Sequence, residues 1–320
     1  MTNNIQFSSV CGIDIAKSVM QVYKVTSDGV VSNKAVKRAD FLNEFRNTPP
    51  ALIGMEACGG SQHWARELQS LGHTVHLMPP KLVKPYVTGL KNDKNDARGI
   101  YKALEMSVRE VPVKSAAIRD LALLQTMRTK RQREKVAKIN HIRGILTEYG
   151  LVMGKSINAF LAKAGSLIVQ LKERADVSPF IVSELNALFP KVKEAMAKIK
   201  ELETNIDSIA KTLKQYDLFR SAPGVGPITA ATMLVLLCNP AVFKNGREFA
   251  AYIGLAPKSS GSDGKNFVTH IPKKCECNND VRALLVQCAH SICRCKHKSD
   301  WVSSILARKP KKVAIIAIAN

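Results

Sequence analysis

The hydrophobic period of this chain changes once along its length, and the change constrains the fold class more than any other feature. Up to about residue 80, apolar residues alternate with polar ones or form short Val- and Ile-rich runs such as "ALIGME" at 51–56. Both patterns predict β-strands. From 115 to about 215, apolar residues recur at intervals of three and four, which predicts helices. The chain is therefore predicted to combine an α/β part with an all-α part.

The first part reads as a β-β-β-α-β unit. Two strands are predicted within 8–25, separated by a bend at Ala16–Lys17, and a hairpin partner follows at 29–37. The run at 51–56 predicts a buried strand, and a helix with Ser61 as its N-cap is expected to run to about Leu71. A last strand over 73–80 stops at two prolines. This order, followed by helices, predicts an α/β domain that ends near residue 110.

Two further regions follow, which divides the chain into domains at 1–110, 111–216 and 217–320. The middle region is predicted to be a helical connector, either an antiparallel helical hairpin or a coiled coil. The last region begins with "SAPGVGPITAATMLV", in which Gly224 and Gly226 precede an apolar helix. This is typical of a helix-hairpin-helix element, whose glycines let backbone N–H groups approach a phosphate. A glycine-rich turn with no ligand is the alternative.

The charge of the chain favours a polyanionic partner. Lys and Arg total 48 against 26 Asp and Glu, a net charge of +22. Residues 109–143 hold ten basic and three acidic side chains, and residues 244–312 hold fourteen and five. Two separate basic stretches indicate a track for nucleic acid more than a membrane patch, although a merely soluble basic protein is the alternative. The candidate nucleic-acid-binding residues are Arg128, Lys130, Arg131, Arg133, Lys135, Gly224, Gly226, Lys258 and Lys265.

The thiols and the apolar runs bear on location and on metal. A leader-like segment and an apolar run of about 18 residues are both missing from the sequence, so a cytoplasmic protein with reduced cysteines is expected. Five of the eight cysteines crowd the end of the chain together with His290 and His297. Zinc is a weak alternative there, because the spacing matches no common finger. These cysteines are Cys275, Cys277, Cys288, Cys293 and Cys295.

Four carboxylates stand where strands end or a helix begins. Asp14 ends the first predicted strand, and Glu56 ends the run at 51–56. A charge at such apolar strand ends is costly unless it is used. Asp93 and Asp96 in "KNDKNDAR" are three apart on a starting helix, so both lie on one face. An N-cap and a first-turn charge that favours the helix dipole are the alternative for this pair.

Converging carboxylates repel each other, and a divalent metal removes the conflict. Four acids without partners would raise one another's pKa. Mg²⁺ prefers oxygen ligands, and two ions about 4 Å apart can clamp the attacking and leaving oxygens of a phosphodiester. An apolar stripe at Ala97, Ile100 and Leu104 is expected to hold the helix against the sheet. The pattern therefore predicts a site for Mg²⁺, with Mn²⁺ as a substitute.

Five motifs of the chain stand out together: "GIDIAK", "MEACGGSQHWARELQSLGHTVHLMPPKLVKPYV", "KNDKNDAR", "SAPGVGPITA" and "FAAYIGLAPKSSGSDGK". They resemble the motifs of the DEDD-type insertion-sequence transposases. That family includes Piv-like DNA invertases and bridge-RNA-guided recombinases. The resemblance covers nearly the whole chain. It implies a RuvC-like (RNase H-fold) domain, a coiled-coil connector and a helical transposase domain, with Asp14, Glu56, Asp93 and Asp96 as the metal-binding tetrad.

The resemblance also implies a nucleophilic serine in the segment after "GLAP". Spacing from Pro257 selects Ser262, whereas the family's Ser-Gly pattern selects Ser260. A serine is a weak nucleophile unless a base or metal activates it, and a flexible Ser/Gly loop is the structural alternative. Implied partners are donor and target DNA, a structured noncoding guide RNA and further copies of the chain as a dimer or tetramer.

The sequence therefore favours a Mg²⁺-dependent DNA recombinase or transposase that works through a covalent serine–DNA intermediate. Two rivals stay open. One is a RuvC-like junction nuclease that uses metal and water. The other is a non-enzymatic, basic DNA-binding scaffold whose carboxylates are incidental.

Overall fold

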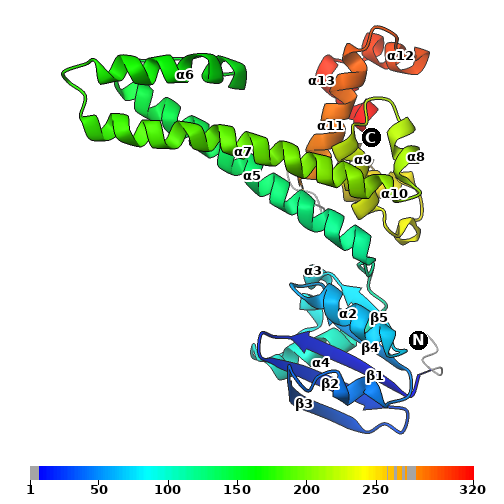
Figure 1. Cartoon of the computed structure of the whole chain (residues 1–320). Helices are drawn as coiled ribbons and strands as arrows, with labels where there is room; N and C mark the ends of the chain where they lie inside the picture. Colours follow the sequence, from blue (N-terminus) through cyan, green and yellow to red (C-terminus); the bar gives the residue numbers. More distant parts are fainter. Residues whose placement is uncertain (1–6, 258, 263–264, 269–270, 272–278) are drawn as a thin grey trace. The chain divides into compact units, whose positions relative to one another are not determined.

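The computed structural model describes residues 7–257, 259–262, 265–268, 271 and 279–320. It divides into two compact units (Figure 1). The N-terminal unit comprises Met1–Ser115 with Cys238–Lys244, and the helical unit comprises Ala116–Leu237 with Asn245–Asn320. The division at 115 lies close to the boundary expected near 110. The expected connector and the C-terminal helices share the second unit.

A five-stranded mixed sheet forms the centre of the N-terminal unit. The strands are β1 (Ser9–Ile15), β2 (Val19–Thr26), β3 (Val31–Lys37), β4 (Ala51–Glu56) and β5 (Thr74–Met78). Their order is β3-β2-β1-β4-β5, with β1, β2 and β3 antiparallel and β4 and β5 parallel to β1. All five predicted strands are confirmed. The mixed sheet is consistent with the expected RuvC-like transposase domain.

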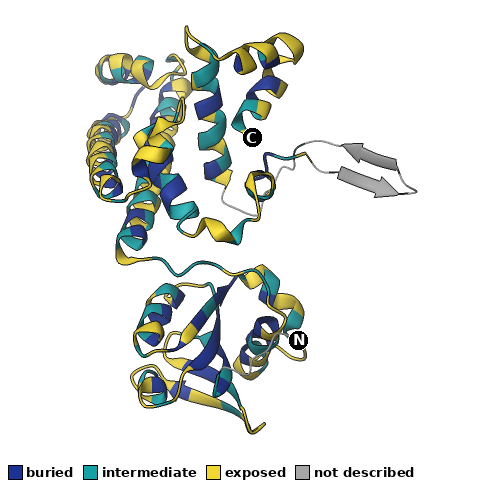
Figure 2. Ribbon diagram, turned by 90° about the vertical axis from the view of Figure 1, so that its right-hand side faces the viewer, coloured by how far each residue is buried: buried dark blue, intermediate teal, exposed yellow. Residues whose placement is uncertain are grey.

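Helices cover both faces of this sheet and create two apolar cores. One face packs against α1 (Asn43–Arg46) and α2 (Ser61–Ser70), where Ile13, Met55 and Trp64 share a core. The other face packs against α3 (Pro80–Val83), η2 (Lys84–Tyr86) and α4 (Asp93–Glu105), whose Ile100 and Leu104 share a core with Leu52. Figure 2 shows β1, β4 and β5 as mostly buried, whereas the edge strand β3 is largely exposed. Because strand residues alternate between faces, Gly12 and Asp14 lie on the α4 side.

The expected N-cap of α2 is wrong by one residue. Gly60, at φ 91°, occupies the N-cap position, and Ser61 is the first helical residue. The buried Ser61 hydroxyl donates a hydrogen bond of 2.9 Å to the carbonyl of Cys58 instead of capping an N–H group of the helix. The positive φ is the reason, since it favours glycine at the turn into the helix.

Three helices form the first part of the helical unit. They are α5 (Ala116–Glu148), α6 (Ile157–Lys172) and α7 (Pro179–Lys211). The long helices α5 and α7 lie side by side and antiparallel (Figure 1). Ile142 and Leu146 of α5, Phe160 of α6 and Leu185 of α7 are fully buried in one core. The predicted helices between 115 and 215 are confirmed, whereas heptad packing of a coiled coil stays a prediction.

Shorter elements complete the chain. They are α8 (Tyr216–Ser221), α9 (Pro227–Leu236), η3 (Pro240–Val242), α10 (Gly246–Tyr252), the hairpin of β6 (Ser259–Ser262) and β7 (Lys265–Val268), α11 (Asn279–Arg294), α12 (Asp300–Arg308) and α13 (Lys311–Ala319). Across the described ranges, no helix combines the length and the hydropathy needed to cross a membrane.

Candidate active site

Three of the four predicted carboxylates converge in the N-terminal unit. Asp14 comes from the end of β1, and Asp93 and Asp96 come from the first turn of α4. One carboxylate oxygen from each of the three residues lies within 4.8 Å of the other two. Glu56, the last residue of β4, lies outside this group but interacts electrostatically with both Asp14 and Asp96. The trio and Glu56 are called the acidic site below.

Two glycines allow α4 to reach the acidic site. A Cβ atom on Gly12 would lie 2.3 Å from the carbonyl oxygen of Ala97 and 2.4 Å from the amide nitrogen of Tyr101, so the α4 backbone contacts β1 directly. A Cβ on Gly54 would lie 3.0 Å from the Leu104 side chain of α4. Each glycine stands two residues before a carboxylate, on the same face of its strand. The motifs "GID" and "GME" carry this signal in the sequence, although neither glycine was predicted as part of the site.

The start of α4 places two charges where a helix favours them. Asn92 is the N-cap, and its side chain accepts a hydrogen bond of 2.9 Å from the amide N–H of Asn95. The Asn95 side chain donates in turn to the Leu90 carbonyl at 2.7 Å, which holds the preceding loop. Asp93 and Asp96 lie in the first turn, where the helix dipole stabilises negative charge. Because Asn92 caps the helix, Asp93 is not needed as its N-cap.

Burial and the neighbouring carboxylates disfavour the ionisation of Asp14 and of Glu56. Burial, followed by the neighbouring charges of Asp96, Asp93 and Glu56, raises the pKa of Asp14 to about 6. Burial, followed by the charge of Asp96, also raises the pKa of Glu56. Both shifts show that ionising these groups together is costly in the protein alone. A bound cation would remove that cost.

The donor set fits a hard divalent cation. All the available ligands are carboxylate oxygens, which Mg²⁺ and Mn²⁺ prefer. Among the described residues, no second group of His, Cys, Asp or Glu side chains is placed to hold a metal. The zinc alternative depends in part on Cys275 and Cys277, which lie outside the described residues. Cys288 is buried, with its Sγ 3.6 Å from Thr229 Oγ1.

The two candidate serines lie in a β-hairpin of the helical unit. Ser262 ends β6 and pairs with Lys265, the first residue of β7, whereas Ser260 pairs with Phe267. The backbone is therefore extended here, where the sequence also allowed an irregular Ser/Gly loop. Lys258 and Asp263 lie outside the described residues. Of Ser260, Ser262 and Lys265, only the backbone position is described.

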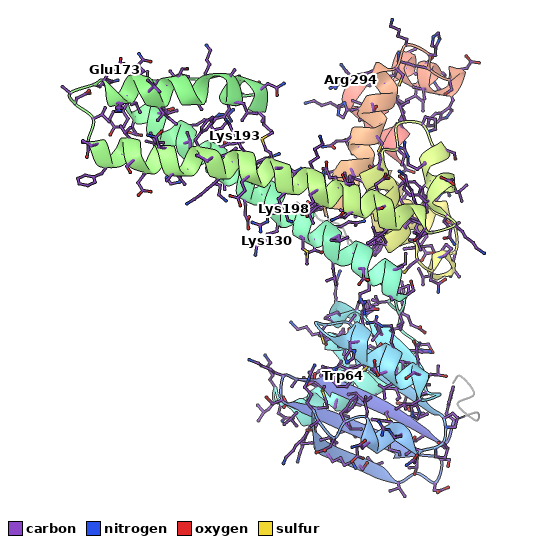
Figure 3. All side chains as sticks on the ribbon, in the orientation of Figure 1. Trp64, Lys130, Glu173, Lys193, Lys198 and Arg294 are labelled. Atoms are coloured by element: carbon purple, nitrogen blue, oxygen red, sulfur yellow. The ribbon has the colours of Figure 1, made fainter. Side chains whose placement is uncertain are left out.

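The predicted basic residues of α5 fall into two sets. Arg128 forms an ion pair of 2.6 Å with Glu203 of α7, and Lys135 is only 8% exposed, so both belong to the packing between helices. Lys130, Arg131 and Arg133 are exposed. Arg131 pairs with Glu134 and Arg133 with Asp280 at 3.0 Å, both at the surface. Figure 3 labels Lys130 on α5. The exposed three offer charge to a partner at little cost to the fold.

The two glycines of "GVGP" differ in their surroundings. Gly224 has φ 75°, and a Cβ there would lie 2.7 Å from the carbonyl oxygen of Cys288 in α11. Close packing against α11 thus accounts for Gly224 without any ligand. Gly226 is the N-cap of α9, and a Cβ there would meet no atom within 4 Å. Gly226 therefore stays a candidate for phosphate contact, and the helix-hairpin-helix assignment stays a prediction.

Comparison with known proteins identifies the family of the chain. A family model of IS110-type DEDD transposases, described as "Transposase", matches residues 11–151, which include all four carboxylates of the acidic site. A second, described as "Transposase IS116/IS110/IS902 family", matches residues 216–302. The chain belongs to this transposase family. It is a DNA transposase, as the resemblance implied.

Relatives match the transposase over nearly its whole length. The "Probable family 20 transposase" of Pseudomonas aeruginosa is 34% identical over 97% of this chain and 93% of the relative. The "Transposase for insertion sequence element IS1111A" of Coxiella burnetii is 31% identical over 97% of this chain and 86% of the relative. The similarity therefore spans both compact units.

Proposed function

We propose that this insertion-sequence transposase cleaves and rejoins DNA at the acidic site with a divalent metal, Mg²⁺ or Mn²⁺. The observation that carries the proposal is the convergence of Asp14, Asp93 and Asp96 within 4.8 Å, with Glu56 beside them. Burial and the neighbouring acids raise the pKa of Asp14 to about 6. Ionising this group of carboxylates is therefore costly unless a cation binds among them.

In this proposal the side chains of the acidic site hold the metal, which would neutralise them and polarise the scissile phosphate when bound. Ser262 is the proposed nucleophile and Ser260 the alternate. The serine Oγ forms a bond to phosphorus while the bond from phosphorus to the leaving DNA oxygen breaks, and that oxygen takes up a proton. A DNA hydroxyl later attacks the phosphoserine and releases the serine, so no phosphodiester bond is lost overall.

The proposed partners follow from the charge and from the family. Exposed Lys130, Arg131 and Arg133 would contact the phosphates of donor and target DNA or of a structured noncoding guide RNA. Two DNA molecules have to be brought together, for which we propose a dimer or tetramer. Three functional parts are proposed: a catalytic domain at 1–110, a connector at 111–216 and a transposase domain at 217–320.

The test is to trap a covalent protein–DNA adduct with Mg²⁺ or Mn²⁺ and to map the linked residue. Wild type should form the adduct, whereas Asp93→Asn should bind DNA but form none. Ser262→Ala should lose the adduct and Ser260→Ala should keep it, and the reverse pattern would move the nucleophile to Ser260. Metal-dependent cleavage by both serine variants would favour a nuclease that uses water. Wild type that forms no adduct and never cleaves DNA with either metal would contradict the proposed role of the acidic site.

A further inference from the structure

A hydrogen-bonded chain of side chains crosses the sheet beside the acidic site. Gln21 of β2 pairs in register with Asp14 of β1, so the two side chains are neighbours on the face that packs against α4. Gln21 is 5% exposed, and its Nε2 donates to Asn33 Oδ1 at 2.6 Å. Asn33, on the edge strand β3, donates from Nδ2 to the backbone carbonyl of Lys94 at 3.1 Å.

This series of hydrogen bonds ends at the first turn of α4, which carries Asp93 and Asp96. Lys94 lies between Asp93 and Asp96 in the first turn of α4. The carbonyl of Lys94 can only accept a hydrogen bond, so Asn33 must direct its amino group toward it. The Oδ1 of Asn33 then faces Gln21, whose amino group donates to it. Gln21 therefore supports the orientation that the Lys94 carbonyl requires of Asn33, and Asn33 holds the turn.

The first turn of α4 has reason to need such a link. The apolar residues that hold α4 against the sheet begin at Ala97, while Asp93 and Lys94 are exposed. Repulsion among the three carboxylates pushes this turn away from Asp14 whenever the site has no cation. A bond from the sheet to the Lys94 carbonyl opposes that displacement. It keeps the ligands close together before a metal arrives, which lowers the cost of binding one.

We propose that Gln21 and Asn33 are positioning residues that hold the metal-binding turn of α4 in place through the Lys94 carbonyl. Neither residue binds metal or DNA in this proposal. It rests on the proposed metal-dependent function, but the link itself can be tested without metal. The variant that tests the link is Asn33→Ala. Its control is Ser32→Ala, which changes the adjacent residue on the same strand.

The first experiment measures amide hydrogen exchange in the full chain with EDTA present. Asn33→Ala should raise exchange at the amides of Asn95 and Asp96 by about 3- to 10-fold, the loss expected for one hydrogen bond. Exchange in β1 and β4 should stay as in wild type, and Ser32→Ala should change neither. Unaltered exchange at Asn95 and Asp96 in Asn33→Ala would overturn the proposed link, whatever the protein does with metal.

The second experiment measures DNA strand cleavage against Mn²⁺ concentration. Asn33→Ala should need about 3- to 10-fold more Mn²⁺ for half-maximal cleavage and should approach the wild-type rate at saturation. Gln21→Met should shift the requirement in the same direction, and the double variant should match Asn33→Ala because both residues act through one link. A lower maximal rate with an unshifted Mn²⁺ requirement would overturn the positioning role. Wild-type cleavage without any metal would overturn the proposed function instead.

Discussion

Removing one charge from the acidic site should stabilise the metal-free transposase at neutral pH. The folded protein raises the pKa of Asp14 from 3.8 to about 6, so the folded state holds that proton more tightly than the unfolded state does. Below about pH 4 the residue is protonated in both states and carries no penalty. Between about pH 4 and about pH 6, Asp14 ionises in the unfolded state but stays protonated in the folded state, so stability falls over this range and levels off above it. Asp14→Asn removes this ionisable group and should remove the fall.

The size of the effect follows from the same pKa. A change from 3.8 to about 6 corresponds to roughly 3 kcal/mol. Asp14 is only half-buried, and solvent screening reduces the figure to about 1–2 kcal/mol. Asp14→Asn should therefore be about 1–2 kcal/mol more stable than wild type at about pH 7.5. The difference should vanish toward about pH 4.

The assay can report on the N-terminal unit alone. The chain has two tryptophans, of which Trp64 is 6% exposed in the N-terminal unit and Trp301 is 57% exposed in the helical unit. In a Trp301→Phe background, Trp64 fluorescence during urea unfolding with EDTA follows the N-terminal unit. Asp28→Asn, in the turn between β2 and β3, controls for a simple change of net charge. Adding Mg²⁺ should stabilise wild type more than Asp14→Asn.

Three results would refute this reasoning. Asp14→Asn could be less stable than wild type at neutral pH, in which case its carboxylate makes favourable contacts in the absence of metal. It could show the same gain at about pH 4 as at neutral pH, in which case the gain does not come from ionisation. Asp28→Asn could give an equal gain, in which case the cause is net charge and not the acidic site.

Further predictions concern the glycine contact and the basic helix. Gly12→Ala should destabilise the N-terminal unit by about 2–3 kcal/mol, because the new methyl group would meet the Ala97 carbonyl, and an unchanged urea midpoint would refute the contact. Lys130→Gln combined with Arg131→Gln should lower the slope of log affinity for DNA against log salt by roughly one to two, measured between about 50 and 200 mM. Arg128→Gln should instead lower the free energy of unfolding by about 1–2 kcal/mol, with little change in the slope of log affinity against log salt.

Much of the fold could be predicted because its causes are local. The strands at 9–15, 19–26 and 51–56 follow from alternation and short apolar runs, and the long helices follow from three- and four-residue spacing. The N-cap of α2 was misassigned because a serine and a left-handed glycine compete for adjacent positions, and only the backbone angle decides between them. Heptad packing cannot be read from spacing alone, since it depends on how two helices approach each other.

The basic helix shows a similar limit. Arg128 and Lys135 are basic residues of the kind expected on a nucleic-acid-binding surface. In the fold, however, Arg128 pairs with Glu203 and Lys135 is buried. The partner of Arg128 lies 75 residues away in sequence, on a helix that packs alongside α5 only after folding. Lys130, Arg131 and Arg133 differ from these two residues because they face solvent. Along a helix of 33 residues, the spacing of apolar residues did not distinguish the exposed basic side chains from the packed ones.

The acidic site shows that predicting which residues form a site is not the same as predicting that they converge. The four acids could be named from strand ends and helix spacing, but their convergence depends on how closely α4 approaches the sheet. That approach depends on the absence of a side chain at Gly12, because any side chain there would collide with the backbone at Ala97 and Tyr101. It is also set by Asn33, 61 residues away from the carbonyl that it binds. Gly12 permits the approach and Asn33 maintains it against the repulsion of the carboxylates. Losing either should therefore weaken metal binding even with all four acids intact, and Gly12→Ala should do so with a larger loss of stability than Asn33→Ala.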